Sequence, residues 1–174
     1  SLLAVIEAEA GRFDEAQQHV THGLEKAREH RLPFPEACLH FARGIGHLAH
    51  GDLPEAAAAM DASYACTPLM WFRGVVRSFQ ARVALQAGHS HDARTYATEA
   101  LKLGSLADGA RTRVLALATL AELSVRDGEH ARAAHFLCDA LDIAVDAALD
   151  PLIVIVLEGL SETYIFRGKD SAAA

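Results

Sequence analysis

The sequence predicts an all-α fold in which about five helix hairpins stack into an α-α superhelix. First, a glycine followed five residues later by an alanine recurs at Gly11, Gly51, Gly88, Gly128 and Gly168, at intervals of 40, 37, 40 and 40 residues. Second, strong helix formers dominate the segments between these glycines, and apolar residues recur there three and four positions apart. Third, the five prolines fall between the predicted helices or in their first turns, where a missing N–H is tolerated.

Each repeat therefore reads as a first helix, a tight turn at the glycine and a second helix. One hairpin leaves an apolar stripe uncovered, so successive hairpins must stack. We expect first helices at residues 1–10, 35–50, 69–87, 107–127 and 151–167, and second helices at 13–30, 54–65, 91–103 and 130–147. A single repeat domain, 1–174, then divides into repeats 1–33, 34–67, 68–106, 107–149 and 150–174. The fifth repeat is cut short and the first residue is Ser, which predicts a fragment of a longer protein.

Small residues occupy matching positions on the two helices of each predicted hairpin. An alanine lies one turn into each second helix, and a small residue lies seven positions before each glycine. Such pairs predict a close crossing of the two helices. The first-helix positions are Ala4, Gly44, Ala81, Ala121 and Ser161.

The turn sequences resemble those of tetratricopeptide repeats. GRFDEA at Gly11 and GDLPEA at Gly51 match well, whereas Ser90, His130 and Asp170 replace the large residue in the other three repeats. The period near 40 also departs from the roughly 34 residues of that family. Longer repeats of this style are similar to the sensor domains of large LuxR-type transcriptional activators of the maltose-regulator kind. The resemblance covers nearly the whole chain and implies a right-handed superhelix that binds a protein, a peptide or a small-molecule effector in its concave groove.

Composition excludes several other classes. A net charge of −7 and a pI near 5.8 argue against direct contact of this segment with nucleic acid. The longest apolar run, residues 152–157, is far shorter than the roughly 20 residues that span a bilayer. Three scattered cysteines suit reduced thiols in the cytoplasm, and the excess of arginine over lysine favours a bacterial source.

No catalytic, cofactor or metal signature emerges. Residues 44–49 fit a permissive dinucleotide fingerprint but fall inside a predicted helix, where that motif has no function. Ten histidines invite a metal site, yet no complete ligand set is visible, and Cys38 lies on a different helix face from His47. Glu158 and Glu162 are one turn apart, as solvated surface pairs often are. We therefore expect no enzyme, no cofactor and no metal.

Charged residues mark one candidate binding surface. Arg82, Glu122 and Glu162 lie six residues before their glycines, the position that lines the concave face in tetratricopeptide-like arrays. Ser78, Gln86, Arg126 and Glu158 should project nearby. The alternative is a solvated face with inter-repeat ion pairs such as Arg82–Glu122, which contribute about 0–1 kcal/mol when exposed.

A second candidate surface is a polar stripe on the first helices of repeats two and three. It comprises His40, Arg43, His47 and Arg77, with Gln80 nearby. Either these first helices are exposed for a partner, or the longer repeat rotates them relative to shorter repeats.

These patterns together predict a binding or sensing module. The leading hypothesis is the regulatory segment of a bacterial LuxR-type transcriptional regulator or a related signalling ATPase. The alternative is a stand-alone tetratricopeptide adaptor that binds a peptide, and the third is a metal- or carboxylate-dependent enzyme.

Overall fold

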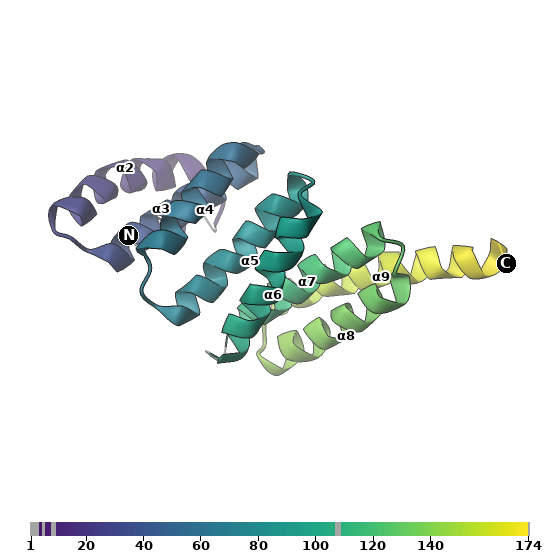
Figure 1. Ribbon diagram of the computed structural model, residues 1–174. Coiled ribbons are helices and arrows are strands. Elements are labelled where there is room, and N and C mark those ends of the chain that lie inside the picture. Colours follow the sequence, from purple (N-terminus) through teal and green to yellow (C-terminus); the bar gives the residue numbers. More distant parts are fainter. Residues whose placement is uncertain (1–3, 5, 8–9, 107–108, 174) are drawn as a thin grey trace.

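The protein is all-helical over the part of the chain that the computed structural model describes. That part comprises residues 4, 6–7, 10–106 and 109–173, with side chains except at residue 14 and at 166–173. The helices follow one another from the N-terminal to the C-terminal end of an elongated array (Figure 1). None within these ranges is long and apolar enough to cross a membrane. Their bounds are α2 (Phe13–Glu29), α3 (Pro33–His50), α4 (Leu53–Cys66), α5 (Met70–Gln86), α6 (Ser90–Leu106), α7 (Ala110–Arg126), α8 (His130–Asp146) and α9 (Asp150–Ala173).

Four of the five repeat glycines form the predicted turns. Gly11, Gly51, Gly88 and Gly128 have φ angles of 77°, 81°, 79° and 77°. Only glycine adopts this left-handed conformation without a Cβ penalty. The next residue then turns its N–H back onto the helix that has just ended, as His89 does to the carbonyl oxygen of Ala84 at 2.8 Å.

The fifth glycine contradicts its prediction. Gly168 lies inside α9, which continues as a helix from Asp150 to Ala173. A glycine turn is stabilised by the second helix that packs back onto the first, and no such helix follows Gly168 in the described chain. Without that packing the helix simply continues, because a glycine inside a helix costs only about 1 kcal/mol relative to alanine.

Small residues at the hairpin crossings are buried as predicted. The second-helix alanines Ala16, Ala56, Ala93 and Ala133 are almost completely buried. So are their first-helix partner positions Ala4, Gly44, Ala81 and Ala121. The corresponding residue of α9, Ser161, is exposed, because no second helix in the described residues packs against it. In the second repeat this position has no room for a side chain, since a Cβ added at Gly44 would lie 2.7 Å from Cε of Met60.

Turns between repeats are built differently from those within them. Arg31 after α2 and Ala148 after α8 adopt φ angles of 50° and 51° without being glycines. In both, the following residue donates its N–H back to the preceding helix, Leu32 to Ala27 at 2.8 Å and Leu149 to Ala144 at 2.9 Å. The residues between α6 and α7 at 107–108, where the fourth first helix was expected to begin, lie outside the described residues.

Stacking of the hairpins makes the structure a superhelix of helical repeats. Each helix packs against its neighbours in sequence, and α5 also contacts α7, as α7 contacts α9. First helices of successive repeats therefore line one continuous face in the C-terminal half. Apolar side chains fill the spaces between the hairpins, so the core is a series of small clusters along the array.

Candidate functional site

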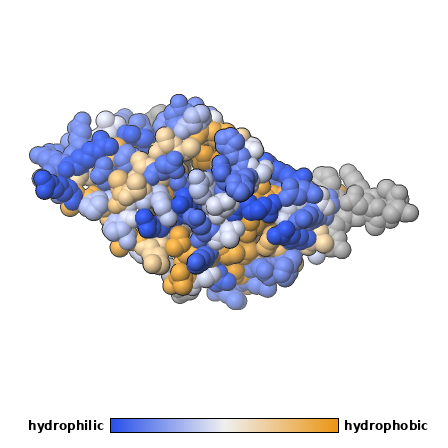
Figure 2. All heavy atoms as spheres, in the orientation of Figure 1, coloured by the Kyte–Doolittle hydropathy of each residue, from blue (hydrophilic) through white to orange (hydrophobic). Residues whose placement is uncertain are grey.

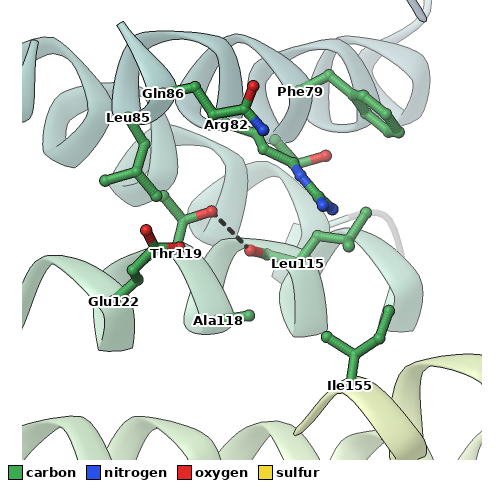
Figure 3. A pocket seen from close by; sticks show the side chains of 10 residues that line it. Phe79, Arg82, Leu85, Gln86, Leu115, Ala118, Thr119, Glu122 and Ile155 are labelled. Atoms are coloured by element: carbon green, nitrogen blue, oxygen red, sulfur yellow. Dashed lines mark hydrogen bonds between the residues drawn. The ribbon is translucent and has the colours of Figure 1, made fainter. Parts of the chain in front are cut away.

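A hollow opens on this face where α5, α7 and α9 meet. Its volume is about 190 Å³. Figure 3 shows Arg82 extending from α5 into the space that Leu115 of α7 and Ile155 of α9 border. The complete lining is Ser78, Phe79, Arg82, Leu85, Gln86, Leu115, Ala118, Thr119, Glu122 and Ile155.

A second hollow adjoins the first along α7 and α9. Its volume is about 360 Å³. It shares Ala118, Glu122 and Ile155 with the first hollow and continues past Glu158 to Glu162. We call the two hollows together the α5–α7–α9 groove. It is open to solvent along its length, with an apolar floor and polar side chains at its edges.

Negative charge dominates the α7–α9 end of the groove. Nη2 of Arg126 pairs with Oε1 of Glu122 at 2.7 Å, while its Nη1 donates to the carbonyl oxygen of Leu85 on α5 at 3.0 Å. Glu122 is therefore paired within α7, and the alternative ion pair Arg82–Glu122 does not form. No ion pair within the described part of the chain engages Glu158 or Glu162, and none engages Arg82.

The residues predicted from the charge pattern gather in this groove, with differences in how they are engaged. Arg82, Gln86 and Glu122 line the first hollow, and Glu158 and Glu162 line the second. Arg126 lies beside them on α7. Ser78 is buried, and its Oγ donates to the carbonyl oxygen of Val75 at 2.7 Å, so its hydroxyl group is already engaged.

Sequence reasoning missed the apolar floor. Phe79 and Ile155 lie three residues before Arg82 and Glu158, a spacing that places each on the same helix face as the charged residue. That spacing could have revealed the apolar floor from the sequence. Thr119 was also missed; its Oγ1 donates to the carbonyl oxygen of Leu115 at 3.0 Å, the bond drawn in Figure 3. On the face seen in Figure 2, apolar patches likewise alternate with hydrophilic ones rather than forming one band.

The second predicted surface, the polar stripe on α3 and α5, is taken up by contacts within the array. Arg77 is the clearest case. Its guanidinium carbon lies 3.8 Å from the ring centroid of Tyr64 on α4, and its Nε pairs with Glu99 on α6 at 2.7 Å. It also donates to Oε1 of Gln80 at 2.9 Å. Arg77 thus connects three helices.

The stripe residues on α3 are also partly or fully covered. His40 is buried, and Arg43 and His47 are half-buried. Nδ1 of His47 lies 3.5 Å from Oδ2 of Asp52. Burial lowers the pKa of His40, and the nearby Arg43 guanidinium acts in the same direction, so the ring is neutral at pH 7. These contacts favour rotation of the helices over a stripe exposed for a partner.

Comparison with known proteins does not assign this chain to a family. Neither the models of known protein families nor the curated proteins contain a match to this chain. The all-helical repeat fold is compatible with a tetratricopeptide-like architecture. Any functional conclusion therefore rests on the groove.

Proposed function

We propose that this protein is a binding module whose α5–α7–α9 groove holds a positively charged peptide or helix of a partner protein. The observation that carries the proposal is a continuous groove with an apolar floor and a carboxylate-rich edge. Concave faces of helical repeat arrays are the surfaces such proteins use for binding.

The open shape of the hollows favours a peptide over a small-molecule effector. Sites that hold a small ligand measure about 300–1,000 Å³ and bury most of it. The first hollow, of about 190 Å³, is below that range; the second, of about 360 Å³, is within it, but both are open to solvent and would leave much of a small ligand exposed. Two adjoining compartments suit two apolar side chains from one face of a helix laid along the groove.

Charge sets the expected chemistry of the partner. Glu158 and Glu162 are exposed and unpaired within the described residues, and the whole chain carries a net charge of −7. Lys or Arg side chains on the partner complement these carboxylates and speed association at low ionic strength. Arg82 marks the opposite end, at α5, where a polar or acidic side chain of the partner fits better.

From the tetratricopeptide-like turns we infer that the module belongs to the regulatory segment of a bacterial LuxR-type transcriptional regulator or a related signalling ATPase. Partner capture would then bias the packing between repeats and, through it, an attached effector domain. The alternative is a stand-alone adaptor with the same groove. Sequencing the flanking open reading frame separates the two, because a helix-turn-helix domain and an ATPase domain belong to the regulator alone.

Selection from a displayed library of random peptides tests the groove. We expect the enriched peptides to combine Lys or Arg with large apolar residues. The double variant Glu158→Lys/Glu162→Lys should bind them at least about tenfold more weakly, since it turns attraction into repulsion.

A matched control is available on α8. Asp142→Lys/Asp146→Lys makes the same charge change at two exposed positions one turn apart, away from the groove. It should leave affinity within about twofold at physiological ionic strength, because distant exposed charges are screened. Equal weakening by both variants would show that only net charge matters, and would refute the groove as the binding site.

A further inference from the structure

Three side chains of different chemistry converge far from the groove, at one end of the α3–α4 hairpin. A carboxylate oxygen of Glu36, a ring nitrogen of His40 and Sγ of Cys66 all lie within 4.8 Å of one another. No other group of three potential metal ligands this close occurs among the described residues. The proposed function makes no use of it.

The hairpin brings these residues together from distant positions in the sequence. Glu36 and His40 are one turn apart on α3 and share a face. Cys66 is the last residue of α4, and because α4 runs antiparallel to α3, its end lies beside the start of α3. Ser63, one turn before Cys66, donates from Oγ to the carbonyl oxygen of Ala37 at 2.8 Å and is fully buried. That bond fixes the two helix ends relative to each other.

His40 carries an unmet hydrogen-bonding group. Its side chain is nine-tenths buried, and its Nδ1 has no hydrogen-bond partner. Its Nε2 lies 3.8 Å from Oε1 of Glu36, which is too long for a hydrogen bond. Cys66 is a half-buried free thiol. Buried polar atoms are normally satisfied, so the His40 ring calls for a further partner, and its Nε2 faces a carboxylate oxygen that it does not hydrogen-bond.

We propose that Glu36, His40 and Cys66 bind a zinc ion, with water as the fourth ligand. Oxygen, imidazole nitrogen and thiolate sulfur are the donors that Zn²⁺ accepts together, and three protein ligands plus water complete its tetrahedron. Metal–ligand distances of about 2.0–2.3 Å place the donors of such a tetrahedron about 3.4 Å apart. The present donors lie up to 4.8 Å apart, so side-chain movements that shorten these separations by up to about 1.4 Å bring them to a zinc-binding geometry.

Arg28 on α2 supplies an outer partner for the site. Its Nε donates to Oε1 of Glu36 at 2.8 Å, and its side chain is mostly exposed. Oε1 is also the oxygen that lies 3.8 Å from Nε2 of His40, so Arg28 and the metal would engage the same carboxylate group. Groups that hydrogen-bond a ligating carboxylate orient it, as Arg28 does here.

Zinc titration of the chelator-treated protein, with a competing indicator dye, tests the site. We expect one tight zinc ion per chain. Cys66→Ser and His40→Gln should each weaken binding by at least 10–100-fold, since even the loss of an outer partner has an effect of that size. Cys138→Ser is the matched control, because Cys138 is exposed on α8, and it should bind zinc like the wild type.

Alkylation of the cysteines in the wild-type protein tests whether zinc binds at Cys66. It does not depend on whether a variant folds. Mass spectrometry should show that zinc slows modification of Cys66 while Cys138 reacts at an unchanged rate, and that a chelator reverses the protection. The proposal is overturned by zinc binding that leaves Cys66 unprotected. It is equally overturned if the wild type binds no zinc, or if folded Cys66→Ser binds as tightly as the wild type.

Discussion

The hydroxyl group of Ser63 on α4 donates a fully buried hydrogen bond to the carbonyl oxygen of Ala37 on α3, over 2.8 Å. It joins the end of a second helix to the start of its first helix across 26 residues of sequence. Elsewhere the hairpins are held by apolar contacts and, in the third hairpin, also by the ion pair between Arg77 and Glu99. The second hairpin thus has a directional contact that fixes how its two helices slide past each other.

Removing this bond should destabilise the protein. Ser63→Ala should lower the free energy of unfolding by about 1 kcal/mol, the net value of a typical buried hydrogen bond. Guanidinium-induced unfolding followed by circular dichroism measures the change. Ser161→Ala is the control, because Ser161 is exposed, and it should stay within about 0.5 kcal/mol of the wild type. Equal effects of the two changes would mean that the bond contributes nothing.

Local sequence signals predicted the hairpins well because a turn at a left-handed glycine depends on few residues. They failed at Gly168 for a physical reason. The glycine permits a turn but does not impose one, and packing by a second helix decides whether it forms. The exposed Ser161 and the buried Ala81, at equivalent positions, show that difference directly.

Alanine substitutions at two repeat glycines should therefore have opposite effects. Gly88→Ala should lower the free energy of unfolding by about 1–2 kcal/mol, because φ is 79° there and a Cβ would meet no atom within 4 Å to offset the strain. Gly168→Ala should raise helix content and should not destabilise, since alanine is favoured by about 1 kcal/mol inside a helix. Thermal unfolding followed by circular dichroism measures both. A loss of stability in Gly168→Ala would contradict this expectation and support the turn that the sequence predicts at Gly168.

The candidate sites were predictable only where the repeat period determines them. Arg82, Glu122 and Glu162 share a groove because the same helical position, repeated once per hairpin, places them on one face of the array. The zinc ligands were not predictable, because the register of α3 against α4 brings Cys66 to His40. The role of Arg77 was equally hidden, since Tyr64 and Glu99 come from two other helices.

Replacing Ala148 by glycine should stabilise the turn between α8 and α9. Ala148 has a φ of 51°, a conformation that costs a non-glycine residue about 1–2 kcal/mol. Ala148→Gly relieves this strain and loses about 0.5–1 kcal/mol through the greater freedom of the unfolded chain, so a net gain of about 0.5–1 kcal/mol is expected. Chemical denaturation checks it. The neighbouring Ala147→Gly, with φ of −94°, relieves no strain and should destabilise; the same sign for both changes would contradict the argument.

Substitutions of two arginines on α5 should show that one contributes to the stability of the fold and the other to peptide binding. Arg77 stacks on Tyr64 and pairs with Glu99, so Arg77→Ala should lower the free energy of unfolding by about 2 kcal/mol. Arg77→Lys should recover only part of this, because an ammonium group keeps the charge but does not stack as a planar guanidinium does. Denaturation with guanidinium measures both.

Arg82 is exposed at the edge of the groove, five residues further along the same helix. Arg82→Ala should change the free energy of unfolding by less than about 0.5 kcal/mol, as expected for a surface side chain without a specific contact. It should nevertheless weaken the binding of those peptides selected on the wild type that place an acidic side chain at the α5 end, because the charge that complements this side chain is lost. Unchanged peptide affinity together with a large loss of stability would assign Arg82 to the scaffold and remove it from the binding surface.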